Sequence, residues 1–196
     1  MRPSGTHSAS LAAPGTAEPQ APPFSAAPMA AGASAWRALI FQDVDGVLNH
    51  SAHGDGTLDL QLLRNLGHLV RKADAAVVVS SAWRKSPRGF KWLLETGLMK
   101  GAGIPRSRIV GATPSLCADV GCRAQEIRCF LQLRMLPPGI PWIAIDDQDL
   151  SSQDPALMTG QHFVRTDARC GLTLAKVHEA EALLLPKAQS FGLAFL

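Results

Sequence analysis

Short apolar runs that each stop abruptly at polar residues constrain the fold of this chain more than any other feature. Three such runs, at residues 37–41, 75–79 and 142–145, are partly β-branched, and residues 162–166 form a weaker fourth. Continuous apolar runs of this length are typical of strands that are buried on both faces of a parallel sheet. We therefore expect these four segments to be strands of one such sheet.

Amphipathic segments lie between the predicted strands. Predicted helices cover residues 58–74, 86–97, 124–133 and 173–185. The second has Ser86 as its N-cap, Pro87 at its first position and Gly97 at its end. In the third, the residues expected to face a core are Ile127, Phe130, Leu131 and Leu133. Strands that alternate with helices predict an α/β fold in which helices cover both faces of a parallel sheet.

The first 35 residues differ in composition from the rest. Arg2 and Glu18 are the only charged residues there, and six of the fourteen prolines fall in this stretch. Such a segment buries too little apolar surface to offset the entropy lost on ordering. We predict a disordered Ala/Pro/Ser-rich tail over residues 1–35 and a folded domain over residues 36–196. A transit peptide for an organelle is a weaker alternative, because the tail has one arginine and no amphipathic pattern.

The composition argues against several classes of function. A formal charge of +3 provides no basic stripe for coating nucleic acid. No run approaches the ~18 apolar residues of a membrane span. The chain has four cysteines, Cys117, Cys122, Cys129 and Cys170. Their spacing in the sequence matches no zinc-binding or redox signature. We therefore expect reduced thiols in a cytoplasmic protein that does not bind membranes.

Polar residues follow three of the predicted strands. These residues are Asp43 and Asp45 after the first, Ser80 and Ser81 after the second, and Asp146 and Asp147 after the third. In a parallel α/β sheet, the carboxyl ends of neighbouring strands meet at the edge where ligands bind. Four carboxylates gathered there would raise one another's pKa unless a cation neutralised them. Because the offered ligands are all oxygens, Mg²⁺ is the expected ion.

The same residues suggest chemistry at phosphorus. A carboxylate beside magnesium is a candidate nucleophile, and a second carboxylate two residues later can donate a proton to the leaving group. Gly46 permits a turn directly after the two acids. A hydroxyl from the next strand and one positive side chain would complete the charge balance of the transition state.

Three segments resemble motifs of the haloacid dehalogenase (HAD) superfamily. "DVDGVLN" (43–49) resembles the first motif, "VVVSSAWR" (77–84) the second and "IAIDD" (143–147) the acidic fourth. Together with "FVRTDARCGLT" (163–173), they look most like the small HAD domain of Swiss army knife RNA-repair proteins. The resemblance covers roughly residues 36–185. It implies a Rossmann-like three-layer sandwich with a mainly parallel central sheet, Mg²⁺ and a phosphoaspartyl intermediate.

The resemblance also implies roles for individual residues. Asp43 is the implied nucleophile and a metal ligand. Asp45 is the implied general acid and later base, and its backbone carbonyl faces the metal. Ser81 is the implied second-motif hydroxyl, and Ser80 is the runner-up. The remaining candidates are Asp146 and Asp147 for the metal, and Gly46 and Arg84 for substrate contact.

The third motif departs from the superfamily pattern. The superfamily normally has a lysine, sometimes an arginine, before the fourth-motif strand, and this chain offers Arg123 at a predicted helix start. Arginine binds phosphate through two parallel hydrogen bonds but is not equivalent to lysine. Arg128, further along this helix, is expected to be solvated. No segment leaves room for a large cap domain, and in this superfamily an open site suits large substrates such as nucleic-acid ends or proteins.

Several other polar residues have a functional and a simpler interpretation. His50 and His53 could touch substrate, but histidines in a polar loop are more often solvated. A structural role explains Trp83 and Arg84 at least as well as a contact between Arg84 and a phosphate does. The simpler interpretations of the remaining candidates are a turn for Asp167 and Arg169 and a loop start for Asp149.

We therefore expect a magnesium-dependent phosphohydrolase that acts on a phosphorylated substrate. The open site can accept a macromolecule as this substrate. One alternative is a non-catalytic HAD-fold protein that binds a phosphorylated ligand or partner, because the usual lysine is missing. Another is a nucleic-acid-end phosphatase in RNA repair, which rests on family analogy alone. The pair of Asp43 and Asp45 favours the enzyme, because a binding module needs no general acid.

Overall fold

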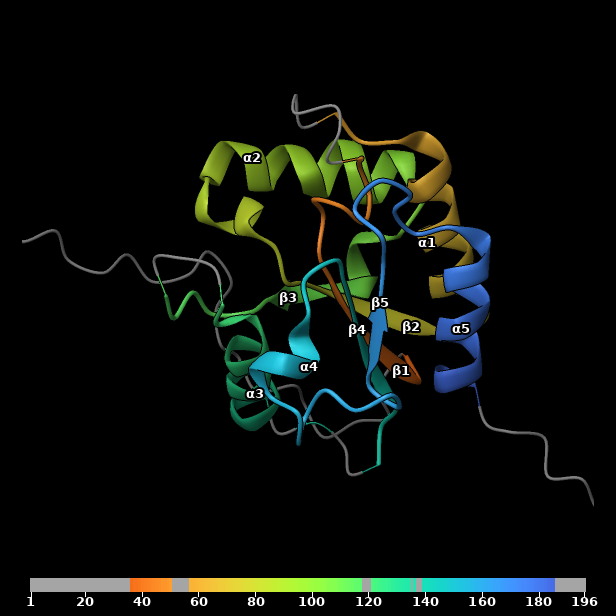
Figure 1. The fold of residues 1–196 in the computed structure, drawn as a ribbon. Helices are drawn as coiled ribbons and strands as arrows, with labels where there is room; N and C mark the ends of the chain where they lie inside the picture. Colours follow the sequence, from red (N-terminus) through yellow and green to blue (C-terminus); the bar gives the residue numbers. More distant parts are fainter. Residues whose placement is uncertain (1–35, 51–56, 118–120, 135, 137–138, 186–196) are drawn as a thin grey trace, which may run out of the picture.

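A five-stranded parallel sheet forms the centre of the molecule (Figure 1). The computed structural model describes residues 36–50, 57–117, 121–134, 136 and 139–185. The predicted tail at 1–35 lies outside these residues, as does the end of the predicted domain at 186–196. The strand order is β3-β2-β1-β4-β5, and every neighbouring pair is parallel. The strands are β1 (Ala38–Gln42), β2 (Ala75–Val79), β3 (Ile109–Ala112), β4 (Trp142–Asp146) and β5 (Phe163–Arg165).

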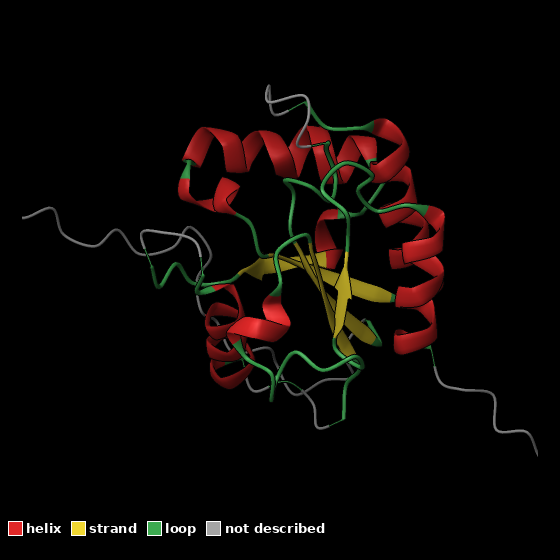
Figure 2. Cartoon of the chain, in the orientation of Figure 1, coloured by secondary structure: helices red, strands yellow, loops and turns green. Residues whose placement is uncertain are grey.

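Helices pack on both faces of this sheet (Figure 2). One face carries α1 (Leu60–Lys72), α5 (Leu174–Leu184) and the helical stretch formed by α2 (Pro87–Trp92) and η3 (Leu93–Gly101). The other face carries α3 (Arg123–Leu133) and α4 (Leu150–Gln153). Short 3₁₀ turns, η2 (Ala82–Lys85) and η4 (Arg106–Arg108), lie between β2 and β3. This arrangement confirms the predicted Rossmann-like three-layer α/β fold.

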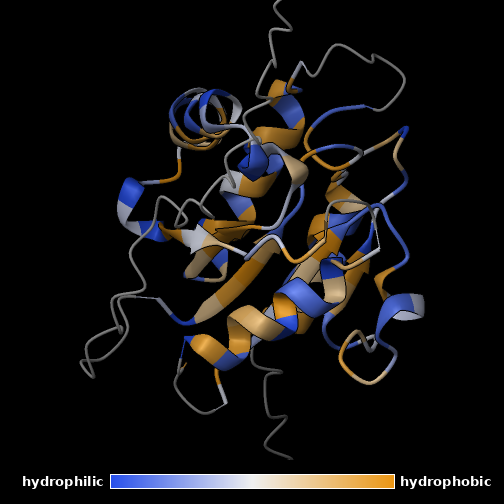
Figure 3. Cartoon of the chain, turned by 90° about the vertical axis from the view of Figure 1, so that its left-hand side faces the viewer, coloured by the Kyte–Doolittle hydropathy of each residue, from blue (hydrophilic) through white to orange (hydrophobic). Residues whose placement is uncertain are grey.

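The apolar interior consists of two hydrophobic cores, one on each face of the sheet, because successive side chains of the buried strands point to opposite faces. Ile40 of β1 belongs to the core shared with α1 and α5, whereas its neighbours Leu39 and Phe41 belong to the core shared with α3. Successive strand residues point to opposite faces, so a strand that is apolar at every position serves both cores. The strands are accordingly mostly hydrophobic in Figure 3, while the helices mix polar and apolar residues.

The helix starts follow the local sequence. Ser86 caps α2 by accepting a hydrogen bond from the backbone N–H of Gly89, and Pro87 occupies the first helical position as predicted. Asp59 caps α1 through the backbone N–H groups of Gln61 and Leu62. Capping by a side-chain oxygen satisfies donors that have no partner inside the helix, which fixes where each helix begins.

Three details of the fold differ from the sequence prediction. The helix that begins at Pro87 does not end at Gly97 but continues as a π-helix to Gly101. Gly97 is buried, and a Cβ there would lie 2.7 Å from the side chain of Leu58, so this glycine allows close packing. Leu133 is 72% exposed and does not face the core. β3 escaped prediction because it is a four-residue edge strand that contains a glycine.

Helices and loops make up the described parts of the connections that leave the carboxyl edge. β1 is joined to β2 through α1, and β2 is joined to β3 through η2, α2, η3 and η4, so no separate cap domain occurs in the described part of these connections. Among the described residues, none of the helices has both the length and the apolar character needed to cross a bilayer.

Candidate active site

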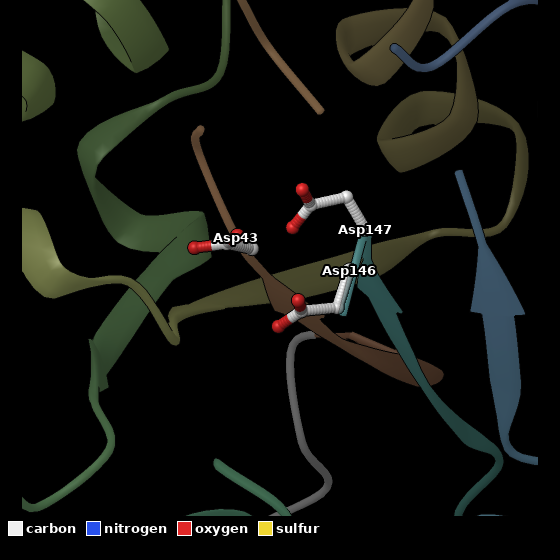
Figure 4. Close-up of side chains that lie close together, drawn as sticks. All are labelled: Asp43, Asp146 and Asp147. Carbon is white, nitrogen blue, oxygen red and sulfur yellow. The ribbon is translucent and has the colours of Figure 1, made fainter. Parts of the chain in front are cut away.

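Three carboxylates meet where β1 and β4 end. Asp43 directly follows β1, Asp146 is the last residue of β4, and Asp147 comes next. Pairing of Gln42 with Ile145 brings the two strand ends together. One oxygen from each of the three carboxylates lies within 4.8 Å of the others. Figure 4 shows the group, with Asp43 reaching it from β1 and the other two from β4.

Burial makes ionisation of this group costly. Desolvation raises the pKa of Asp43 to about 6, although the charge of Arg123 acts to lower it. Desolvation, and then repulsion from Asp43, raise the pKa of Asp146 well above its ordinary value. The pKa of Asp147 is also raised, chiefly by burial. A cation at this position would relieve both effects, because it would replace lost hydration and screen the repulsion.

One positive side chain already lies among the carboxylates. Nη1 of Arg123, at the first residue of α3, donates to Oδ1 of Asp43 at 2.9 Å and to Oδ2 of Asp146 at 3.2 Å. Burial acts to lower the pKa of Arg123, but Asp43, Asp146 and the other nearby carboxylates outweigh burial and raise it. One guanidinium cannot balance three ionised carboxylates, so a divalent cation fits the remaining charge.

The donor set matches magnesium in its chemistry. Asp43, Asp146 and Asp147 offer only carboxylate oxygens, which hard divalent cations prefer. Mg²⁺ is commonly held by one or two carboxylates together with waters and a phosphate group. These three residues are therefore the ones that could hold the ion.

Asp45 lies apart from this group and is held by other partners. Its two carboxylate oxygens accept the indole N–H of Trp83 at 3.0 and 2.9 Å. The amide of Asn49 donates to the same carboxylate at 2.9 Å. Asp45 is exposed, whereas Asp43 is only 3% exposed. The chain therefore presents one buried carboxylate beside the metal-type group and one fixed, solvent-accessible carboxylate two residues later.

A family model described as the HAD domain in Swiss Army Knife RNA repair proteins matches residues 39–177, which is more than half of the 196 residues. The chain belongs to this HAD family. No curated protein and no solved structure matches it. Membership implies a phosphohydrolase type of function, and the three carboxylates form a group that could hold a metal ion.

The two serines of the HAD second motif have different neighbours. Ser81 is fully buried, and its hydroxyl forms a hydrogen bond with Asp43 that acts to lower the pKa of that carboxyl. It also accepts the backbone N–H of Trp83 at 3.4 Å. The hydroxyl of Ser80 instead accepts from Thr113 at 3.4 Å. Contact with Asp43 favours Ser81 over Ser80 as the hydroxyl of the site.

Gly46 combines two constraints in the turn after the HAD first motif. Its φ is +72°, a left-handed conformation that glycine adopts without strain. A Cβ at this position would lie 2.6 Å from Oδ2 of Asp147. Its N–H donates to Asn49 and its carbonyl accepts from Thr166, both at 2.9 Å. Gly46 therefore gives Asp147 the space to reach the carboxylate group, a role separate from the substrate contact that was predicted for it.

Arg84 is turned into the protein. Its guanidinium donates to the carbonyls of Thr113 at 3.0 Å and Pro114 at 3.1 Å, and also to the carbonyl of Ser81. It forms a buried ion pair with Glu126. These contacts favour a structural role for Arg84, tying η2 to α3, over the substrate contact that the sequence suggested.

Sequence reasoning missed several partners in the HAD site. Trp83 and Asn49 were not connected with Asp45, although Asn49 lies four residues after it inside the first motif. Glu126 had no signal in the sequence, yet its carboxylate pairs with Arg84 and lies 3.8 Å from Nε of Arg123. Glu126 therefore helps to hold the start of α3, and with it Arg123, beside η2.

The other polar candidates have partners away from the carboxylates. The ring of His50 contacts the carbonyl of Arg169 at 3.0 Å and the carboxylate of Asp59 at 3.2 Å, and His53 lies outside the described residues. Asp167 and Arg169 form an exposed ion pair in a turn. Earlier in the chain, Asp149 caps α4, and Arg128 pairs with Asp154 at 2.5 Å. None of these interactions joins the described carboxylate group.

The expectation that all four cysteines are reduced is wrong for two of them. Cys117 and Cys122 form a disulfide with Cα atoms 6.1 Å apart, while Cys129 and Cys170 are free. The expectation rested on the spacing of the cysteines in the sequence, which does not report that Cys117 and Cys122 lie close together in space. Cys122 is the N-cap residue of α3, so the bond constrains the chain directly before Arg123.

Proposed function

We propose that this HAD domain is a magnesium-dependent phosphohydrolase that acts through a phosphoaspartyl intermediate. The observation that supports this function best is the division between two carboxylates. Asp43 is buried among Arg123, Asp146 and Asp147, and Asp45 is held separately by Trp83. One environment suits a nucleophile and the other suits a proton donor.

Asp43 and Asp45 perform complementary parts of the proposed reaction. An oxygen of Asp43 attacks the phosphorus, the bond from phosphorus to the leaving oxygen breaks, and Asp45 gives that oxygen a proton. A water then attacks the phosphorus of the phosphoaspartyl group while Asp45 takes up its proton. The bond between phosphorus and Asp43 breaks, which releases phosphate and restores the carboxylate of Asp43 and the protonated carboxyl of Asp45.

The remaining residues prepare this reaction. Asp146 and Asp147, with Asp43, would hold Mg²⁺, which supplies positive charge that screens the carboxylates from an anionic substrate. The backbone carbonyl of Asp45 is a further proposed ligand. Arg123 fixes Asp43 by a hydrogen bond and offers positive charge to a phosphoryl group. The hydroxyl of Ser81 lies beside Asp43, where it can donate to a phosphoryl oxygen.

The phosphorylated end of a nucleic acid is the proposed substrate. The description of the matched family, which concerns RNA repair proteins, supports this choice. The absence of a separate cap domain from the described connections is compatible with a large substrate. Generic phosphoesters with exposed phosphate groups should also be hydrolysed, because the proposed chemistry involves only the phosphoryl group and the leaving oxygen.

Hydrolysis of p-nitrophenyl phosphate by the full chain tests the reaction. We expect activity with Mg²⁺, none with excess EDTA, and a loss of at least about 10³-fold for Asp43→Asn, because the amide cannot act as the nucleophile. Asp167→Asn, which removes an exposed carboxylate from a turn, is the matched control. Activity that survives chelation or Asp43→Asn contradicts the mechanism. A folded protein that binds phosphoesters but hydrolyses none supports the alternative of a non-catalytic binding protein.

A further inference from the structure

Two tryptophans form a continuous aromatic surface that begins at the proposed general acid. The rings of Trp83 and Trp92 have centroids 5.8 Å apart and an interplanar angle of 32°. The indole N–H of Trp83 contacts the carboxylate of Asp45, which places one end of the pair at the site. Trp92, the last residue of α2, is 43% exposed.

This exposure is unusual for the residue type. Tryptophan is on average among the more buried side chains, and Trp36 in this protein is only 3% exposed. The packing of Trp83 against the main core explains why its ring is fixed. The exposed area of Trp92 lacks such an explanation, since the core contact made by α2 comes from Phe90 instead. Trp92 is thus an exposed ring that packs against the fixed ring of Trp83, which itself contacts Asp45, and such a pair is suited to stacking on a planar group.

The chain segment that carries the two tryptophans is basic. Residues 82–94 contain four basic residues and no acidic one. Of these, Arg84 is buried against Glu126, while Arg88 and Lys91 are exposed. Arg88, Lys91 and Trp92 stand at i, i+3 and i+4 in α2, so they share one side of the helix. Aromatic rings next to cations are the combination by which proteins bind single-stranded nucleic acids through bases and phosphates.

We propose that Trp83 and Trp92 stack on the terminal base of a phosphorylated single strand, and that Arg88 and Lys91 bind its following phosphates. The inference rests on the proposed function, because it assumes that the terminal phosphate lies between Asp43 and Asp45. Stacking would hold the strand end so that its leaving oxygen faces Asp45. The test must distinguish this strand from two competing occupants of the exposed Trp92 ring, a protein partner and a second copy of the chain.

Binding without turnover tests this surface directly. The probe is a fluorescently labelled, terminally phosphorylated oligonucleotide of about six nucleotides, titrated with the full chain in excess EDTA and followed by anisotropy. We expect Trp92→Ala to weaken binding roughly 10-fold and Trp92→Phe to weaken it less, because a smaller ring still stacks. Leu133→Ala is the control, because Leu133 is also an exposed apolar side chain but lies on α3, away from α2. This variant should bind the oligonucleotide like the wild type.

Two further arms separate base stacking from charge alone. A strand whose terminal nucleotide is abasic should bind the wild type about as weakly as the intact strand binds Trp92→Ala. Replacing both Arg88 and Lys91 by glutamine should reduce the salt dependence of binding. Equal affinity for intact and abasic strands overturns the proposal. So does wild-type affinity in Trp92→Ala, and a change of oligomeric state in that variant would identify a protein interface instead.

Failure of the stacking proposal can be distinguished from failure of the proposed phosphohydrolase function. Base-dependent binding without any magnesium-dependent hydrolysis would reject the phosphohydrolase and leave the stacking surface in place. Hydrolysis that requires Asp43 but shows no preference for intact over abasic strands would support the phosphohydrolase and reject the stacking surface. The kcat/KM for the intact strand divided by the kcat/KM for glycerol phosphate adds a kinetic readout. Trp92→Ala should lower this quotient by raising the KM for the strand.

Discussion

Nη1 of Arg123 lies 2.9 Å from Oδ1 of Asp43 and 3.2 Å from Oδ2 of Asp146. One nitrogen of the guanidinium thus joins the proposed nucleophile to a proposed metal ligand. The pair is buried, because the side chains of Arg123 and Asp43 are 9% and 4% exposed. Removing a charge from such an arrangement leaves uncompensated charge in the interior, which costs more than a surface pair of the same length would.

We expect Arg123→Met to lower kcat by about 10²- to 10³-fold, the range found when one donor to a reacting group is lost. Arg123→Lys should remain within about 10-fold of the wild type, because its ammonium can reach Asp43 while losing the second hydrogen bond. Steady-state kinetics at saturating Mg²⁺ measures both, and circular dichroism checks the fold. Wild-type rates for the methionine variant would show that this charge has no part in the reaction.

The contact between Trp83 and Asp45 leads to a prediction about leaving groups. Trp83→Phe keeps an aromatic ring but removes the N–H that both oxygens of Asp45 accept. A misplaced general acid matters most when the leaving oxygen is basic, because such an oxygen cannot leave without a proton. We expect a loss of about 10-fold or more for alkyl phosphates and about threefold or less for p-nitrophenyl phosphate.

Asp45→Asn provides the reference for this series. It should show the steepest dependence of rate on the pKa of the leaving group, and Trp83→Phe should lie between it and the wild type. An equal loss for all leaving groups in Trp83→Phe would indicate that the ring only supports the fold.

Local patterns were sufficient to predict the frame of the molecule. The apolar runs gave the buried strands, and Ser86 with Pro87 gave the start of α2, because caps and strand burial depend on neighbouring residues alone. The meeting of Asp43 with Asp146 followed from the general rule for carboxyl ends in parallel sheets. The family resemblance added the expected roles, and the matched family confirms the superfamily.

Contacts between distant segments could not be predicted in this way. Trp83 and Asp45 are 38 positions apart, and Arg84 and Glu126 are 42 apart. Whether an arginine near a strand end faces substrate or the interior depends on which carbonyls and carboxylates surround it. Arg84 met Glu126 and three carbonyls, and no property of its own neighbours in sequence indicates this. The packing role of Gly97 likewise depends on Leu58.

The raised pKa values predict how metal binding depends on pH. The pKa of Asp43 is about 6 in the absence of metal, and that of Asp146 is also raised, so protons compete with Mg²⁺ in mildly acidic solution. We expect Mg²⁺ to raise the melting temperature clearly at pH 8 and little at pH 5. Asp147→Asn should reduce the shift at pH 8, whereas Asp167→Asn should retain it. A shift of equal size at both pH values would contradict a site made of these carboxylates.

The metal-free protein should show the opposite trend. Between the ordinary pKa of 3.8 and the folded value of about 6, the native state holds a proton on Asp43 that the unfolded chain has lost. The stability from this group is therefore fully present below pH 3.8 and is lost as the pH rises through about 6. Urea unfolding in EDTA at several pH values measures it, and comparison with Asp43→Asn isolates the part that belongs to Asp43.

Backbone conformation and the proposed metal binding are linked at Gly46. Gly46→Ala should cost about 1–2 kcal/mol of the free energy of unfolding, because a Cβ is unfavourable in the left-handed region. The same Cβ would approach Oδ2 of Asp147 to 2.6 Å and displace that carboxylate. We therefore expect the Mg²⁺ concentration for half-maximal activity to rise about 10-fold, as it does when groups that orient metal ligands are altered.

Gly103→Ala is the matched control for this effect. Gly103 has a similar φ of +67°, and its Cβ would meet only the end of the Arg71 side chain at an ordinary 3.8 Å. This variant should lose a comparable free energy of unfolding in EDTA but keep its Mg²⁺ requirement. Equal Mg²⁺ requirements in the two variants would mean that Asp147 does not hold the metal. A higher requirement in Gly46→Ala alone would tie the glycine of the first motif to the ligand at the end of β4.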